Sequence, residues 1–309
     1  MKNKIVFFGT PVFAAEILSY LLSHPVPIVG IVTQPDRPRG RSLQITPSAV
    51  KEVALQSSPS ISLLQPKKAS EEVFLSQLSA LNADLYVVVA YGQILPQKLL
   101  SMPPLGCINV HASLLPKYRG AAPIQRCLMA GEMETGISIQ KMVRQLDAGD
   151  VIETVKIPVP PEMTYGELEA QLRELSKTVL LHVLKAYEKG IPSATPQDSA
   201  LASYASKVEL EEGEIQWTES AVSLHNQIRA FSPRPGAWCW QEIGKKRVKI
   251  LRSRVIEKRG IPGQLLSRNG VVACGEESLE LIEVQPEGKK TMSASDWLRG
   301  LPSFHQFPS

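Results

Sequence analysis

Residues 85–90 read LYVVVA, an unbroken apolar run of the kind that a strand buried on both faces of a parallel sheet carries. Similar runs at 4–9, 26–33 and 108–111 predict further strands, and 136–142 and 150–159 predict two more. Apolar residues at helical spacing predict helices that start at Pro11, span 123–130 and span 164–189, the last ending at Gly190. This alternation predicts an α/β fold: a mostly parallel sheet with helices on both faces.

A different pattern follows the long helix. Residues 190–206 are rich in Pro, Ser, Ala and Thr, which is typical of a linker. A short helix is predicted at 220–230, and short strands separated by turns at 237–242, 248–255, 263–266, 271–273 and 279–284. We therefore predict a catalytic domain over 1–189, a linker over 190–206, and a small OB-like β-barrel domain over 207–309.

Composition and motifs exclude several classes of protein. The chain has 309 residues and is 43% hydrophobic, as ordinary globular proteins are, and it lacks the ~18-residue apolar run of a membrane span. The apolar N-terminal run is too short for a signal peptide, and the four cysteines are isolated. We expect a cytoplasmic, metal-free protein. The first strand-to-helix turn lacks GxGxxG, which argues against a nicotinamide oxidoreductase, and P-loop and nucleophile-elbow motifs are absent as well.

The segment INVHASLLPKYRG at 108–120 carries the main candidate site. Asn109 and His111 are two apart, so on a strand they face one spot at its carboxyl end, where ligands bind in open α/β sheets. Asp147 lies in a second polar segment, LDAGD at 146–150. Each residue alone also fits a structural role in a turn or a hydrogen-bonded strand end. Together an amide, an imidazole and a carboxylate suit acyl transfer.

Basic residues gather in two places. The segment QPDRPRGRSLQITP at 34–47 is long for a connection, and it is either a flexible loop or a loop that orders on an anionic partner. Between Arg229 and Arg268 there are eleven lysines and arginines and only two glutamates. That excess of positive charge fits two alternatives equally well: a solvated protein surface, or a surface that binds a phosphate backbone. Four tryptophans (Trp217, Trp238, Trp240 and Trp297) could stack on bases, although most fit the barrel core better.

Several segments together resemble the folate-dependent formyltransferases over nearly the whole chain. They are FFGTPVFAA (7–15), TQPDRPRGR (33–41), VVVAYGQILP (87–96), GCINVHASLLPKYRGAAPIQR (106–126), QLDAGDVI (145–152), IRAFSPRPGAW (228–238) and EGKKTMSASDWL (287–298). The PDRPRGR loop, the basic barrel and the GKKTMSASDWL ending resemble the methionyl-tRNA formyltransferase family within this group. The resemblance implies a Rossmann-like formyltransferase domain followed by an OB-like, tRNA-binding domain.

The resemblance also implies an activity and site residues. The family transfers a formyl group from the co-substrate 10-formyltetrahydrofolate to the α-amine of methionine on initiator Met-tRNA, for translation initiation. It implies catalytic roles for Asn109, His111 and Asp147. The residues implied to bind folate are Ala90, Tyr91, Gly92, Ile94, Ser113, Leu114, Leu115 and Pro116. The tRNA contacts would be Arg37, Arg39, Arg41, Lys245, Lys246, Arg247 and Lys249. No metal, membrane or second copy of the chain is expected.

One departure and three alternatives remain open. The loop continues after Arg41 with Ser42, Leu43 and Gln44, a neutral stretch where the family often has lysines, so the loop should contribute less binding or depend on its three arginines. An amino-sugar nucleotide formyltransferase would share the catalytic trio, but the PDRPRGR loop argues against it. A formyltetrahydrofolate hydrolase would not need a basic barrel. A catalytically silent RNA-binding protein would not need the trio.

Overall fold

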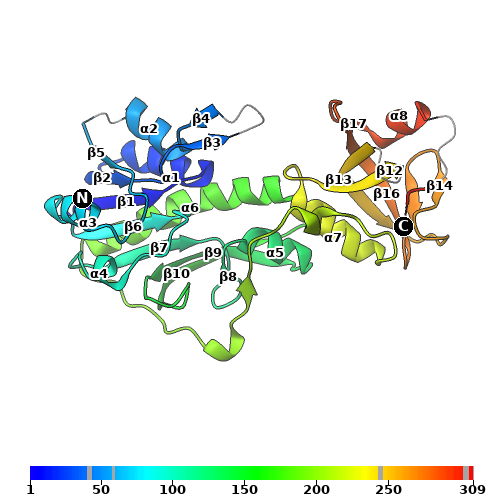
Figure 1. The fold of residues 1–309 in the computed structure, drawn as a ribbon. Coiled ribbons are helices and arrows are strands. Elements are labelled where there is room, and N and C mark those ends of the chain that lie inside the picture. Colours follow the sequence, from blue (N-terminus) through cyan, green and yellow to red (C-terminus); the bar gives the residue numbers. More distant parts are fainter. Residues whose placement is uncertain (40–43, 58–59, 243–245, 302–305, 309) are drawn as a thin grey trace. The chain divides into compact units, whose positions relative to one another are not determined.

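A seven-stranded sheet forms the centre of the N-terminal part of the chain (Figure 1). The computed structural model describes residues 1–39, 44–57, 60–242, 246–301 and 306–308. In spatial order the strands are β10 (Val151–Pro158), β9 (Glu134–Lys141), β7 (Cys107–His111), β6 (Leu85–Val89), β1 (Ile5–Gly9), β2 (Ile28–Val32) and β5 (Ser62–Leu64). The five strands from β7 to β5 are parallel, and β9 is antiparallel to β7. The predicted mostly parallel sheet is confirmed.

Every residue of β1, β6 and β7 is buried. The unbroken apolar sequences of β1 and β6 require this of central strands, whereas β7 also buries the polar residues Asn109 and His111. Along the first 189 residues the helices are α1 (Val12–Leu22), α2 (Ala49–Ser57), α3 (Glu72–Ala80), α4 (Gln97–Leu100), α5 (Pro123–Met129) and α6 (Tyr165–Tyr187). Helix α6 begins with a capping box, because Thr164 and Glu167 exchange side-chain to backbone hydrogen bonds of 2.9 and 3.4 Å. The sequence predicted α1, α5 and α6 and missed α2, α3, α4 and β5.

The basic segment at 34–47 contains a hairpin where the sequence suggested only a loop. Strands β3 (Arg37–Arg39) and β4 (Gln44–Thr46) pair antiparallel, with Arg37 opposite Thr46. Asp36 anchors the start of the hairpin, because its carboxylate accepts hydrogen bonds from Lys51 at 2.7 Å and Gln65 at 2.9 Å, which lower the pKa of Asp36. These contacts tie the base of the hairpin to α2 and to the residue that follows β5. Residues 40–43, including Arg41, lie outside the described residues.

The C-terminal part is built on an antiparallel sheet. Its strands are β12 (Ala237–Glu242), β13 (Lys246–Ile256), β16 (Ser278–Pro286), β15 (Val271–Ala273) and β14 (Leu265–Ser267) in spatial order, and β17 (Met292–Ser293) pairs with β16. The predicted strands are all present, within a few residues. Helices α7 (Ala221–Phe231) and α8 (Ala294–Arg299) accompany the sheet, and Ser220 and Ser293 cap them. Short elements complete the chain: β8 (Arg119–Gly120), η1 (Ser199–Leu201), β11 (Tyr204–Ala205) and η2 (Glu211–Gly213).

The tryptophans of this part divide into two kinds. Trp217 and Trp297 are buried, and Trp217 stacks on Phe307 with ring centroids 5.0 Å apart. Trp238 and Trp240 are half-buried on one face of β12. Core packing therefore accounts for the first pair, as the sequence suggested, and leaves the second pair partly accessible to a ligand.

The chain forms two compact units. The first comprises residues 1–120, 136–157 and 171–204, and the second comprises 121–135, 158–170 and 205–309. Most of the predicted linker, residues 190–204, thus belongs to the first unit. The limits of the predicted domains remain a prediction.

Candidate active site

Strand β7 ends in the two polar residues that the sequence singled out. Asn109 and His111 are only 9% and 5% exposed, and their spacing points both to one face of the strand. On the neighbouring antiparallel strand β9, Gln140 lies opposite Asn109 and Ser138 lies opposite His111. Because directly opposed residues share a face, these four polar side chains lie on the same side of the sheet.

Asp147 completes this cluster from the loop after β9. Its Oδ1 accepts hydrogen bonds from Asn109 Nδ2 at 3.3 Å and from Gln140 Nε2 at 2.8 Å. Its Oδ2 accepts from the backbone N–H of Gly120 at 2.9 Å and lies 3.7 Å from His111 Nδ1. These donors fix the plane of the carboxylate. The structure therefore brings together the three residues that were predicted to be catalytic.

The ring of His111 is oriented by its other nitrogen. His111 Nε2 lies 2.8 Å from the backbone carbonyl oxygen of Tyr118, so Nε2 must carry a proton in order to donate there. In the neutral ring Nδ1 then holds the lone pair, and a second proton would bind at Nδ1. The ring nitrogen with the lone pair, Nδ1, thus faces the carboxylate of Asp147.

Strained backbone marks this end of the sheet. Asp147, Tyr118 and Ala90 have positive φ values of 48°, 61° and 45°. A left-handed conformation costs a residue with a side chain about 1–2 kcal/mol, and such residues cluster at functional sites. Tyr118 supplies the carbonyl that holds His111, and Ala90 directly follows β6 beside β7. The strain therefore supports identification of this region as the functional site.

The predicted folate-binding residues differ in exposure. Tyr91 is buried with its ring 5.5 Å from that of Phe8, and burial raises its pKa to about 12. Ser113 is also buried and donates its hydroxyl to the carbonyl of Lys117 at 2.6 Å. The Ser113 hydroxyl is thus occupied within the fold, whereas the buried Tyr91 hydroxyl has no hydrogen-bond partner among the described residues. The other predicted residues are exposed or half-buried: Ala90, Gly92, Ile94, Leu114, Leu115 and Pro116.

Large apolar side chains are exposed in the loops that follow β6 and β9. Ile94 is 86% exposed after β6, and Val143 and Leu146 are 45% and 58% exposed just before Asp147. Large apolar side chains in solvent beside a few positioned polar groups are typical of a site for a flat, partly apolar ligand.

Sequence reasoning missed the residues that support the trio. Gln140 and the backbone of Gly120 bind the Asp147 carboxylate, and the side chain of Gln197 binds the backbone of the Asp147 turn. The alternation of β9 would have indicated Gln140 only if its register against β7 had been known. No signal in the sequence distinguished Gln197 within a segment that has the composition of a linker.

Some basic side chains of residues 229–268 form ion pairs with glutamates, and others are exposed to solvent. On β13, Arg252 pairs with Glu167 and with Glu283, and Arg254 pairs with Glu280 at 3.7 Å. Lys246 and Arg247 are exposed and Lys249 is half-buried, whereas Lys245 lies outside the described residues. The basic side chains that are not paired with a carboxylate in this way lie at the start of β13, where Lys249 Nζ donates to the backbone carbonyl of Pro235 at 2.5 Å.

An arginine covers the two accessible tryptophans at this place. The guanidinium carbon of Arg247 lies 4.1 Å from the ring centroid of Trp238 and 4.8 Å from that of Trp240. The predicted RNA-binding arginines of the hairpin give less information. Arg37 donates to Gln34 at 3.0 Å, while the side chain of Arg39 and all of Arg41 lie outside the described residues.

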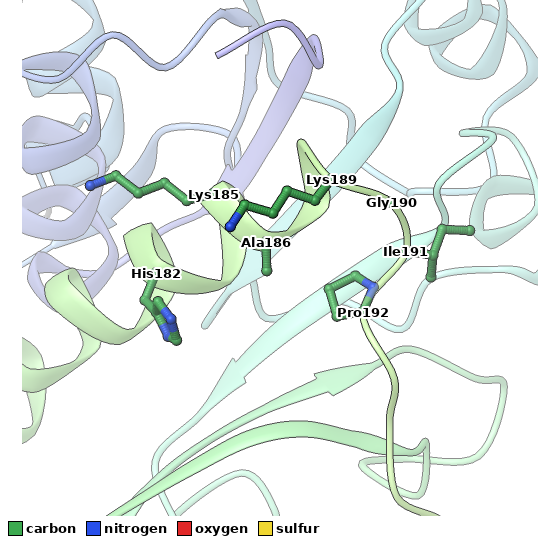
Figure 2. A pocket seen from close by; sticks show the side chains of 7 residues that line it. All are labelled: His182, Lys185, Ala186, Lys189, Gly190, Ile191 and Pro192. Atoms are coloured by element: carbon green, nitrogen blue, oxygen red, sulfur yellow. The ribbon is translucent and has the colours of Figure 1, made fainter.

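We find no second candidate site among the described residues. A surface hollow of about 510 Å³ lies at the end of α6, and none of the candidate residues lines it. Figure 2 shows the side chains that do. Among the residues that the structure covers, no group of three His, Cys, Asp or Glu side chains is arranged to hold a metal ion. Within that same part of the chain, every helix is too short or too polar for a membrane span.

Comparison with known proteins shows which family the chain belongs to. Residues 3–184 match the formyl transferase family, and residues 207–302 match the formyl transferase C-terminal domain family. The methionyl-tRNA formyltransferase of Protochlamydia amoebophila is 49% identical over 306 residues, covering 97% of this chain and 96% of that protein. The methionyl-tRNA formyltransferase of Chlamydia caviae is 44% identical, with coverages of 97% and 96%.

Solved structures show the same fold. HypX from Aquifex aeolicus, solved in complex with tetrahydrofolic acid, superposes with a TM-score of 0.62 at 16% identity. The match covers 98% of this chain and 48% of HypX, so this chain spans about half the length of that protein. With two family matches that cover most of the chain and relatives above 40% identity along nearly all of it, the chain belongs to the formyl transferase family and, within it, to the methionyl-tRNA formyltransferases.

Proposed function

We propose that this chain transfers the formyl group of 10-formyltetrahydrofolate to the α-amino group of methionine on initiator Met-tRNA. The product is N-formylmethionyl-tRNA for translation initiation. The observation that carries the proposal is the contact of Asp147 with both Asn109 and His111, in a chain whose relatives are methionyl-tRNA formyltransferases. The tetrahydrofolic acid bound by HypX, which shares the fold, supports the folate donor.

Asn109 and His111 stabilise the negative charge that grows on the formyl oxygen. The Asn109 amide has two N–H groups, and one of them donates to Asp147, so the other remains for the formyl oxygen. His111, once protonated at Nδ1, offers a charge-assisted hydrogen bond on the same face. Positioned donors at a developing oxyanion contribute a large share of the rate enhancement in acyl transfer.

Asp147 transfers the proton that the attacking amine loses. The amine nitrogen forms a bond to the formyl carbon, the bond from that carbon to folate N10 breaks, and one proton must move from the amine to N10. Asp147, directly or through an ordered water, accepts this proton and returns it, and its negative charge stabilises protonated His111 at 3.7 Å. Because the amine attacks directly, no side chain of the enzyme needs to act as a nucleophile.

The remaining site residues position the two substrates. Ile94, Val143 and Leu146 supply exposed apolar surface for the folate ring, together with the backbone of residues 90–94 and 113–116. Lys246, Arg247 and Lys249 carry the available positive charge for the tRNA backbone, supported by the arginines of the β3–β4 hairpin. We infer a cytoplasmic enzyme that works as a monomer, because translation takes place in that compartment and the proposed site is formed within one chain.

Acceptor selectivity tests this function. Purified protein would be incubated with formyl-labelled 10-formyltetrahydrofolate, either without an acceptor or with one of three acceptors: Met-tRNA, uncharged tRNA or an amino-sugar nucleotide. We expect label on Met-tRNA alone, at the methionine amine. Label on the sugar would support the amino-sugar alternative, and release of tetrahydrofolate without any acceptor would support the hydrolase alternative; either result would contradict the proposal.

A further inference from the structure

Gln197 links the two segments that hold the catalytic trio. It lies within residues 171–204 of the first unit, and its side-chain amide is fully used. Its Nε2 donates to the backbone carbonyls of Asp147 at 2.9 Å and Gly149 at 2.7 Å, and it also lies 3.4 Å from the acceptor Gln140 Oε1. Its Oε1 accepts from Nε and Nη2 of Arg119 at 3.0 and 2.8 Å. A flipped amide would oppose donors to donors and acceptors to acceptors, so these partners fix its orientation.

One end of this link holds a strained turn. Asp147 has a φ of +48°, and Gln197 binds the carbonyl of Asp147 itself and that of Gly149 two residues later. Space in the turn is limited as well, because a Cβ at position 149 would lie 1.7 Å from the carbonyl oxygen of Lys141. A left-handed Asp persists only when its surroundings over-determine it, and the Gln197 amide is such a constraint.

The other end holds the segment that orients His111. Arg119 is buried, with 2% exposure, and it lies between two residues that contact the trio. The carbonyl of Tyr118 accepts from His111 Nε2, and the N–H of Gly120 donates to Asp147 Oδ2. Gln197 therefore connects the backbone that sets the His111 ring to the backbone that sets the Asp147 carboxylate.

We propose that Gln197 is a positioning residue for formyl transfer, which sets the distance and angle between the His111 ring and the Asp147 carboxylate through Arg119 and the Asp147 turn. The inference rests on the proposed function, and it assigns this role to a residue that does not touch the reacting atoms. Small displacements of catalytic groups are costly, since about 1 Å can reduce a rate by ~10²-fold.

Two variants separate positioning from stability. Gln197→Glu keeps the size of the side chain and can still bind Arg119, but it loses both donors to the turn. Gln197→Ala loses both ends of the link. Asp198→Ala is the matched control, because Asp198 is the exposed neighbour that caps η1 through a hydrogen bond to Ala200 and does not contact the trio.

The measurements are kcat, KM for both substrates, and the pH profile of kcat/KM on protein whose folded fraction is determined by circular dichroism. We expect kcat to fall about 10- to 100-fold in both Gln197 variants, with KM values close to wild type and a displaced pH midpoint. Asp198→Ala should keep the wild-type kcat and midpoint. Loss of folded protein alone would lower the amplitude of the profile without moving its midpoint.

Three results would overturn the inference: wild-type kcat in both folded Gln197 variants, an unmoved pH midpoint, or an equal loss in Asp198→Ala. A wild-type protein that does not formylate Met-tRNA would contradict the proposed function instead. The two failures are therefore distinguishable, since the first compares variants and the second concerns the wild-type chain alone.

Discussion

Replacing Asp147 by Asn should abolish most of the activity and also weaken the fold. The carboxylate accepts from three N–H donors and faces His111, so every contact of its two oxygens is with a donor or a potential donor. The Asn amide has the same shape but only one acceptor oxygen. With that oxygen toward Asn109 and Gln140, its NH₂ group opposes the N–H of Gly120 across a distance that is now 2.9 Å.

The magnitude follows from these contacts. One mismatched donor at a nearly buried position costs about 1–3 kcal/mol of unfolding free energy. The effect on turnover is separate, because an amide cannot accept the transferred proton or stabilise protonated His111. Loss of a positioned acid or base lowers turnover by at least ~10²-fold, and we expect a loss of that size in Asp147→Asn.

Single-turnover transfer of labelled formyl to Met-tRNA would give the rate, and urea unfolding would give the stability. Asp150→Asn is a suitable control, since it changes a carboxylate of the same turn while the backbone carbonyl of residue 150 still accepts from Lys141. Near wild-type turnover in folded Asp147→Asn would refute the assigned proton transfer. A comparable loss in Asp150→Asn would show that the turn, not the Asp147 carboxylate, determines the rate.

Three further predictions follow from individual contacts. Gly149→Ala should displace the Asp147 turn and lower both kcat and thermal stability, because its Cβ would meet Lys141 O at 1.7 Å; unchanged kcat would contradict this. Hydrogen bonds from Arg126 lower the pKa of Glu212 below its usual 4.5. This pair therefore stabilises the fold above pH 4.5, and its contribution is lost as the pH falls through the lowered pKa. In Glu212→Gln the unfolding free energy should depend less steeply on pH in the acid range, and an unchanged slope would refute this prediction. Reversing the charges of Lys246, Arg247 and Lys249 should reduce the slope of the logarithm of the tRNA-binding constant against the logarithm of salt concentration, by about one unit per lost phosphate contact. Arg254→Glu is the control, because Arg254 already faces Glu280. Equal slopes for all variants would show that β13 is not part of the tRNA interface.

The elements that could be predicted from the sequence are those with strong local signals. The apolar runs of β1 and β6, and the helical spacing of apolar residues in α6 with Gly190 after its end, identify buried strands and a long helix before any tertiary contact is known. Helices α2 and α3 were missed because their short segments mix polar and apolar residues, and only packing against the sheet determines them. The β3–β4 hairpin depends on Asp36, whose partners Lys51 and Gln65 are distant in the chain.

The candidate site shows the same division. Asn109 and His111 could be paired from their spacing on one strand, and Asp147 stood out in the polar segment at 146–150, which begins 35 residues after His111. The family resemblance then implied that the three residues act together. Gln140 required the register of β9, and Gln197 required a backbone path that returns from residue 197 to the Asp147 turn. Long-range hydrogen bonds of this kind leave no local pattern, so only the folded structure shows them.

The central claim is that Asn109, His111 and Asp147 act together to transfer formyl to the methionine amine of Met-tRNA. Its most direct test is the single-turnover rate of that transfer in three proteins: wild type, His111→Ala, and His182→Ala, which changes a largely exposed histidine of α6 outside the site. We predict a fall of at least ~10²-fold in His111→Ala alone, with tRNA binding and folding intact. Near wild-type transfer by folded His111→Ala would contradict the account.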